Sequence, residues 1–200
     1  MRNAIRTVAL ALFLVLAGRA DGNAQAQPWW WGFTYQTSLT TGEMKDFVDD
    51  FSWRNVGVEG RSKIGPNATL GVFFGWNVFS DEVDGTISFD GLDVSGYQSR
   101  WVNAFPMLVT GHYYLGERGG PRTYIGLGAG TYWIRNRLAL GQTAVTIDHW
   151  HFGLAPEVGV LIPTQAYSDT YVSVKYNYAV ESGDMQRSYW TFGIGFATPY

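Results

Sequence analysis

Apolar and polar residues alternate with a period of two in repeated stretches of the chain after residue 26. The stretch at about 69–79 is the clearest example, because Leu70, Val72, Phe74, Trp76 and Val78 alternate with Gly71, Phe73, Gly75 and Asn77. Successive side chains of a β-strand point to opposite faces, so this pattern predicts a strand with one apolar and one mainly polar face. No stretch after residue 26 shows a convincing period of 3.6 residues, which favours an all-β fold.

The same alternation predicts eight strands. Their approximate ranges are 30–39, 54–64, 69–79, a stretch within 97–115, 122–136, 146–162, 169–181 and 187–200. On the last strand, the apolar face carries Trp190, Phe192, Ile194, Phe196 and Tyr200. Pro106 lies in the middle of 97–115, and proline has no amide hydrogen to give to a sheet. We therefore expect a bulge at Pro106 and assign no faces across it.

An even number of amphipathic strands is typical of a β-barrel that crosses a bacterial outer membrane with its apolar face toward lipid. In a soluble β-barrel or sandwich, the solvent-facing positions are rich in Lys, Glu, Asp and Thr. Here the polar faces carry mainly Gly, Asn, Ser and Thr, which suits the crowded interior of a small barrel. We predict an eight-stranded antiparallel up-and-down transmembrane β-barrel at 27–200, with a soluble periplasmic β-barrel as the alternative.

The first 26 residues have the features of a cleaved signal peptide. Arg2 and Arg6 precede the apolar stretch 7–18, which is shorter than the roughly 20 residues of a membrane-spanning helix. Cleavage is expected after Ala26, with a second candidate site after Ala20. The segment predicts export, and together with the strands it places the protein in the outer membrane of a Gram-negative bacterium.

Composition and charge narrow the functional classes. Aromatic residues make up 16% of the chain and charged residues 16%, against a usual charged share of about 25%, which excludes a disordered protein. The absence of cysteine excludes disulfides, thiol catalysis and Cys-based zinc sites. Loss of a signal peptide with three arginines and one aspartate makes the formal charge of −3 more negative. An acidic chain without a basic stripe is a poor candidate for nucleic-acid binding.

The connections between the predicted strands differ in length. Those at 64–67, 116–121 and 163–168 are short, those at 40–52 and 80–97 are long and acidic, and those at 140–145 and 182–186 are short again. Membrane barrels have short periplasmic turns and longer extracellular loops. The alternation is imperfect, but it places both chain ends on the periplasmic side.

Two segments and the aromatic-rich strands carry a family resemblance. With residues 124–130 (YIGLGAG) and 189–200 (YWTFGIGFATPY), the chain resembles the small eight-stranded outer-membrane β-barrel family, which includes the OmpA transmembrane domain and OmpX-type proteins. The C-terminal segment is similar to the signal that such proteins present to the barrel assembly machinery, which implies that Tyr200 closes the last strand. Pro199 departs from the commonest form of that signal. The resemblance implies an architecture more than an activity.

Charged residues on the polar faces are the candidate functional residues. They are Glu59, Arg61 and Lys63 of the second strand, Glu157 of the sixth, Lys175 of the seventh and, with its face unassigned, Arg100 of the fourth. Eight strands enclose a space just wide enough for side chains to fill, so a porin-type pore is not expected. Because buried charges are tolerated when paired, we predict a lumen charge network that fills the barrel. A proton or ion pathway through the same groups is the alternative.

Catalytic and metal-binding patterns are weak. Residues 148–151 (DHWH) form a His-rich stretch, and His151 and Ser173 share the inward face of adjacent strands with Glu157. The His-x-Ser spacing of the lipid A deacylase is absent, because Gly153 occupies the serine position. We therefore expect no enzyme, metal or cofactor, and keep a lipid-modifying or small-solute-handling barrel as the alternative.

The expected role is structural, in envelope integrity or in surface interaction. The expected partners are outer-membrane lipids and lipopolysaccharide, together with the barrel assembly machinery during biogenesis. No nucleic-acid partner is expected, and the barrel is predicted to be a monomer.

Overall fold

The structure of the chain is a computed structural model that describes residues 30–89, 92–117, 119–140, 143–165, 168–180 and 186–198. Side chains are described at these positions except at 84–89, 92–95, 140 and 165. The predicted signal peptide at 1–26, both cleavage sites and the predicted closing residue Tyr200 lie outside the described residues.

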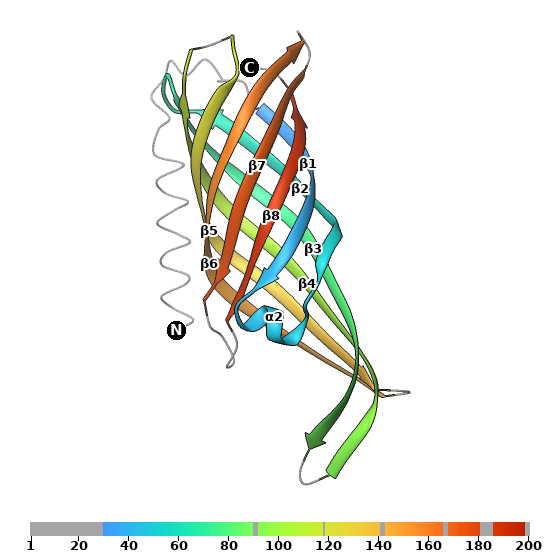
Figure 1. Cartoon of the computed structure of the whole chain (residues 1–200). Helices are drawn as coiled ribbons and strands as arrows, with labels where there is room; N and C mark the ends of the chain where they lie inside the picture. The colour runs from blue at the N-terminus through green and yellow to red at the C-terminus, as the bar shows by residue number, and fades with distance from the viewer. Residues whose placement is uncertain are drawn as a thin grey trace, which may run out of the picture.

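Eight strands form one closed antiparallel barrel (Figure 1). They are β1 (Trp30–Thr41), β2 (Phe51–Lys63), β3 (Ala68–Phe89), β4 (Leu92–Leu115), β5 (Arg122–Leu140), β6 (Thr143–Gln165), β7 (Ser168–Ala179) and β8 (Arg187–Ala197). Each strand pairs with its neighbour in sequence, and β8 pairs with β1 over Gly32–Thr41 to close the sheet. The predicted all-β, eight-stranded antiparallel barrel is confirmed.

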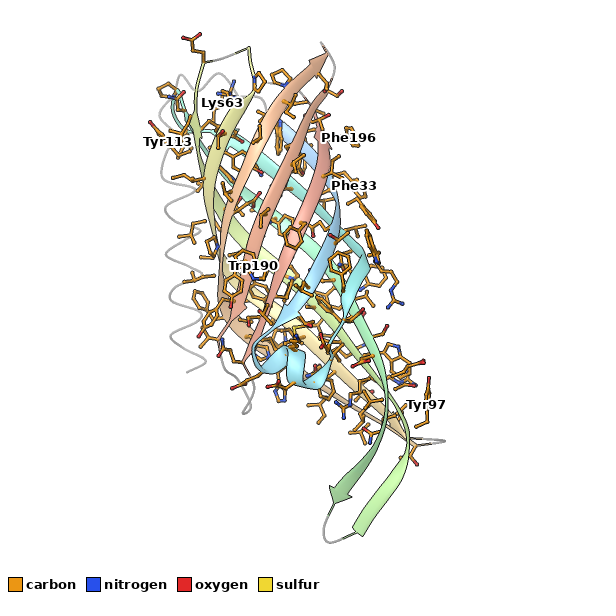
Figure 2. The ribbon with its side chains drawn as sticks, in the orientation of Figure 1. Phe33, Lys63, Tyr97, Tyr113, Trp190 and Phe196 are labelled. Atoms are coloured by element: carbon orange, nitrogen blue, oxygen red, sulfur yellow. The ribbon has the colours of Figure 1, made fainter. Side chains whose placement is uncertain are left out.

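The apolar face of each strand points outward and the polar face points into the barrel. On β8, Trp190, Phe192, Ile194 and Phe196 are exposed, while Thr191 between them is buried. Phe33, Trp190 and Phe196 lie on the outside of the barrel in Figure 2. This arrangement is inverted relative to a soluble barrel, whose apolar side chains point inward, and it is the one required by a lipid surround. It therefore disfavours the soluble periplasmic alternative.

The expected bulge at Pro106 is wrong. The register between β4 and β5 runs without a shift from Phe105–Trp133 through Pro106–Tyr132 to Met107–Thr131. The β3–β4 register is also the same on the two sides of Pro106. The ring of Pro106 instead lies beside Gly75 of β3, where an added Cβ would come within 2.9 Å of it. A glycine therefore accommodates the proline, and the inward face continues through Pro106, which is itself buried.

The two long acidic connections contain secondary structure that the alternation does not predict. Most of 80–97 belongs to β3 and β4, which pair as far as Phe89–Leu92 and project beyond the barrel at the end opposite the C-terminus (Figure 1). The short helix α2 (Glu43–Phe47) lies within the predicted loop 40–52. Within the described residues, no helix has the length and apolar character needed to cross a membrane.

Inward glycines allow the interior side chains to pack. A Cβ at Gly126 would come within 2.5 Å of the His112 ring, and one at Gly128 within 3.0 Å of Leu108. At Gly130 an added Cβ would collide with the backbone carbonyl of Met107 on the neighbouring strand. A clash with backbone is not relieved by a change of rotamer, so Gly130 is required by the close approach of β4 and β5.

We expect Gly130→Ala to destabilise the barrel by about 1–3 kcal/mol, the usual cost of overpacking. Gly111→Ala is the matched control, because an added Cβ on this outward-facing residue has no heavy atom within 4 Å. The measurement is the urea midpoint of unfolding in lipid vesicles, followed by tryptophan fluorescence. Equal midpoints for the two variants would contradict the close backbone approach at Gly130.

Candidate functional site

A cluster of buried charges occupies the lumen, and its first element is an ion pair within β2. Arg61 and Glu59 share one face of the strand because they are two residues apart, and their burial shows that this face points inward. The guanidinium donates Nε–H to Glu59 at 3.0 Å and Nη2–H to the two carboxylate oxygens at 2.8 Å each. Arg61 also donates to the hydroxyl of Tyr114 on β4 at 2.7 Å. Neither charge is accessible to solvent, since Arg61 is 0% and Glu59 3% exposed.

Glu157 of β6 connects this pair to three further strands. Its carboxylate lies 3.2 Å from Lys175 Nζ on β7 and 3.9 Å from Arg61 Nη2. The hydroxyl of Tyr124 on β5 donates to Glu157 at 2.8 Å, and His112 Nε2 on β4 lies 3.8 Å away. Glu157 thus receives contacts from both cations of the cluster.

Aromatic side chains surround the two cations. The guanidinium carbon of Arg61 lies 4.6 Å from the ring centre of Trp30, 5.2 Å from that of Tyr124 and 5.7 Å from that of Tyr171. Lys175 Nζ lies 3.5 Å from the ring centre of Phe73. Cation–π contacts become stronger away from water, so these rings partly replace the hydration that the cations lose on burial. Two carboxylates and two cations also balance in formal charge, as a buried cluster requires.

Two of the six predicted lumen charges lie elsewhere. Lys63 is half-buried close to the end of the barrel at which β1 begins and β8 ends, the end predicted to be periplasmic (Figure 2). Arg100 lies at the opposite end, predicted to be extracellular, and donates to the carbonyl of Phe47 in the α2 helix and to Gln98 Oε1, both at 3.1 Å. Glu59, Arg61, Glu157 and Lys175 come together, whereas Lys63 and Arg100 lie outside this group.

The extracellular end of the lumen is covered by α2. Met44 and Val48 are fully buried among interior residues such as Phe79 and Tyr189. The guanidinium carbons of Arg100 and Arg187 lie 5.5 and 5.4 Å from the ring centre of Phe47. Glu43 fixes the helix by accepting a hydrogen bond from the backbone N–H of Gln186 at 2.8 Å.

Between the charge cluster and α2, neutral polar side chains fill the barrel. Tyr132 donates to Asn177 at 3.1 Å, and Asn177 donates to Thr191 at 2.9 Å. Asn77 of β3 donates to Tyr189 of β8, the register partner of Asn177, at 3.2 Å. The described interior is therefore packed along its length.

Comparison with known proteins defines the fold. No protein-family model matches the chain, and no curated protein matches it in sequence. The crystal structure of Neisserial surface protein A (NspA) matches with a TM-score of 0.56 at 11% identity, covering 86% of this chain and 97% of the other. A major outer-membrane protein from Thermus thermophilus matches with a TM-score of 0.53 at 13% identity, covering 84% and 98%.

The chain has the fold of the small outer-membrane β-barrels. At these identities the likeness extends to the fold alone, and it agrees with the predicted family resemblance and outer-membrane location. The outward apolar face supports the same location on physical grounds.

Three of the cluster's residues are missing from the sequence-based set for this outer-membrane barrel. His112 and Tyr114 lie on β4, where the expected bulge at Pro106 prevented any assignment of faces. Tyr124 is adjacent to the outward-facing Ile125, so the alternation alone is enough to place it inward. A tyrosine at an inward position is a signal that a search restricted to charged residues overlooks.

The possible catalytic set is not brought together by the barrel. Ser173 of β7 pairs with Gly159 of β6, eight positions along the strand from His151, or about 27 Å at roughly 3.4 Å per residue. His151 Nδ1 lies 3.0 Å from the carbonyl of Val180 at the extracellular end. In the part of the chain that the structure describes, no group of three or more His, Asp or Glu side chains is arranged to hold a metal ion.

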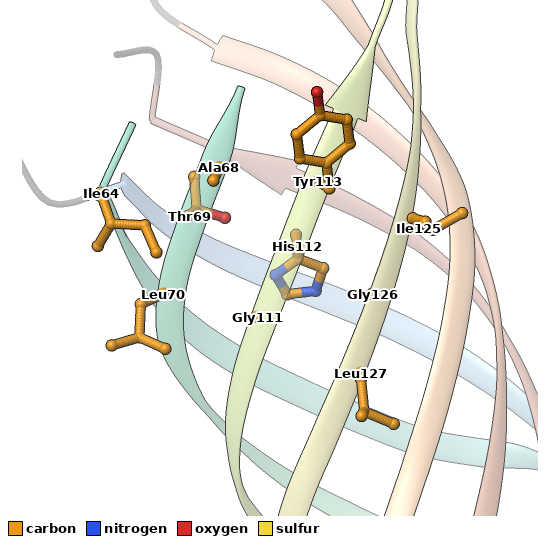
Figure 3. A pocket seen from close by; sticks show the side chains of 10 residues that line it. All are labelled: Ile64, Ala68, Thr69, Leu70, Gly111, His112, Tyr113, Ile125, Gly126 and Leu127. Carbon is orange, nitrogen blue, oxygen red and sulfur yellow. The ribbon is translucent and has the colours of Figure 1, made fainter. Parts of the chain in front are cut away.

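A recess of about 400 Å³ lies on the outer wall of β3, β4 and β5 (Figure 3). Gly111 leaves a gap between outward side chains that include Leu70, Tyr113 and Leu127. The lining includes His112 but no carboxylate, so it lacks the acid–base set of a hydrolase. The recess therefore gives no support to the lipid-modifying alternative.

We expect Glu157→Gln to destabilise this outer-membrane barrel by about 3–5 kcal/mol, because the variant leaves buried Lys175 and Arg61 without the shared carboxylate. Lys175→Met is expected to cost a similar amount. The double variant should lose less than the sum of the two, because it removes both members of the pair. Urea unfolding in vesicles measures all three, and additive losses would contradict direct coupling of Glu157 and Lys175.

Proposed function

We propose that the protein is a non-enzymatic outer-membrane barrel with a closed lumen that supports a rigid β-sheet at the cell surface for interaction with a partner. The observation that carries the proposal is the extension of four strands beyond the other four. Pairing continues to Phe89–Leu92 between β3 and β4 and to Leu140–Thr143 between β5 and β6. By contrast, β6 pairs with β7 only as far as Gly153–Ala179.

The projecting sheet has an open edge along β6. Residues 143–151 pair with β5 on one side and, among the described residues, with no strand on the other. Val145 and Ile147 on this segment are 54% and 52% exposed. An unprotected edge presents free backbone N–H and C=O groups, to which an extended segment of a partner can add as a further strand. This edge supports surface interaction over a purely structural role.

The packed interior supports a role without solute transport. The charge cluster, the polar side chains above it and α2 occupy successive levels of the lumen. A hydrated path through these levels would have to separate Glu157 from its cations or displace α2. The proposal therefore places function on the outer surface, and it favours surface interaction over the small-solute-handling alternative.

The proposal also includes outer-membrane lipids and the barrel assembly machinery as partners. The outward apolar face fits outer-membrane lipids, and the alternating apolar residues of β8 fit recognition by the barrel assembly machinery. A monomeric barrel is proposed because the sheet closes on itself through β1 and β8, so barrel formation requires no second chain.

A strain that lacks the gene provides the test, with adherence and self-aggregation of intact cells as the readout. Wild-type protein is expected to restore the adherence or self-aggregation that the deletion strain loses. The variant Val145→Lys/Ile147→Lys should not restore it, because charges on an edge strand oppose strand addition. Ser99→Lys is the control, since it adds a lysine to the same sheet on β4, which is paired there with β3 through Glu82 and with β5 through Ala139.

Heat-modifiable migration and surface labelling confirm that each variant folds and reaches the surface. Full restoration by the edge variant would contradict the proposed use of β6. A deletion that changes only detergent sensitivity, and not adherence or aggregation, would favour the envelope-integrity role.

A further inference from the structure

A row of aromatic rings crosses the outer wall of four neighbouring strands. Trp76, Phe105, Trp133 and Trp150 lie on β3 to β6, with ring centres 6.2, 5.1 and 6.3 Å apart and planes 9°, 27° and 22° from parallel. Aromatic girdles of this kind lie where the apolar belt of a membrane barrel meets the polar headgroups. The row therefore marks the extracellular boundary of the belt on this side of the barrel.

Two arginines occupy the next outward positions beyond this boundary. Arg135 and Arg137 follow Trp133 on β5 at steps of two residues, so all three share the outer face, and both arginines are exposed. Arg135 pairs in register with Asn103 and Asp148, and Arg137 with Trp101 and Thr146. Both guanidinium groups thus project from the wall at the level expected for outer-leaflet headgroups.

Each guanidinium is held over an aromatic ring. The guanidinium carbon of Arg135 lies 4.7 Å from the ring centre of Trp133, and that of Arg137 lies 5.6 Å from the ring centre of Trp101. Stacking of this kind orders the side chain and leaves N–H donors at the edge of the guanidinium for an oxygen ligand. The two arginines are therefore preorganised to donate hydrogen bonds.

No carboxylate of the described residues forms an ion pair with either arginine. Asp148 is the register partner of Arg135, but its carboxylate accepts a hydrogen bond from the indole N–H of Trp133 at 3.3 Å. A third exposed arginine, Arg54 of β2, donates to Ser80, the register partner of Trp101. Three arginines thus lie on this part of the outer wall, with Asp148 as the register partner of one of them.

We propose that Arg135 and Arg137 form a binding site for the phosphate group of an outer-leaflet glycolipid, the lipid A portion of lipopolysaccharide. Phosphate matches the donor geometry of guanidinium, which binds its oxygens in a bidentate manner. Below the site, outward residues such as Ala129, Phe152 and Leu154 offer an apolar wall to the acyl chains. Charge complementarity and continuity with the lipid-facing belt select a lipid-borne phosphate over a soluble anion. The site is separate from the β6 edge.

The test uses purified full-length protein in neutral detergent micelles, titrated with fluorescently labelled lipid A that carries its phosphates or has been dephosphorylated. Wild-type protein is expected to bind the phosphorylated form more tightly. Arg135→Gln and Arg137→Gln should each weaken that binding roughly tenfold, the effect of losing a charge-assisted hydrogen bond, and leave the dephosphorylated form unaffected. Arg→Lys at either position should give an intermediate loss, since lysine keeps the charge without the bidentate geometry.

Lys45→Gln is the charge-matched control, because Lys45 is an exposed cation of α2 away from the belt, with 55% of its side chain accessible. It should leave binding within about twofold of wild type, a difference well below the tenfold that one charge-assisted hydrogen bond represents. Heat-modifiable migration verifies the fold of each variant, and either Arg→Gln variant suffices for the test if the other folds poorly. Equal affinity of wild type and the Arg→Gln variants would overturn the proposal. Displacement of lipid A by millimolar inorganic phosphate would overturn it too, because the site would then be one for soluble anions.

Discussion

A sheet surrounded by lipid must satisfy its backbone hydrogen bonds within itself, because the bilayer core offers no water to replace them. In this chain the pairing of β1 with β8, from Gly32–Ala197 to Thr41–Ser188, meets that requirement. Closure removes both edges of the sheet at the level of the membrane and fixes one face toward lipid and one toward the interior. The inverted amphipathicity of the strands follows from this single constraint.

Closure also determines what the interior must contain. Eight strands leave a space that side chains just fill, and the inward face is polar, so buried polar groups have to satisfy one another. The Arg61–Glu59 pair and the Glu157–Lys175 pair do so toward the periplasmic end, with aromatic rings around the cations. At the extracellular end, where the strands continue beyond the bilayer, α2 replaces this network with a small apolar cluster around Met44. The stability of the barrel and the closure of its lumen thus have the same physical origin.

The period of two is sufficient to predict the fold and the faces of most strands. Alternate residues of each strand face lipid and the packed interior, so the two environments require different residue types at alternate positions. It does not predict the projection of β3 and β4, where acidic residues such as Asp81 and Glu82 resemble a loop and only cross-strand pairing makes the segment extended. Five residues of α2 are too few to show a helical period. Knowing that a charged side chain points inward also does not tell which charges come together. Arg100 and Lys63 lie outside the cluster because they are at opposite ends of the barrel. Their position along the barrel depends on the register and direction of the strands, which the alternation does not give.

The central claim is that the lumen is packed and excludes water, and a thiol-accessibility measurement tests it most directly. The chain has no cysteine, so single Ser38→Cys and Ser173→Cys variants place one small thiol on an inward position, with exposed Thr164→Cys as the reference. A charged, water-soluble thiol reagent is added to the folded protein in vesicles, and the rate of modification is followed. The two lumen thiols are predicted to react far more slowly than the reference until the barrel is unfolded. Reaction of both lumen thiols at the rate of the reference would show a hydrated lumen and contradict the account.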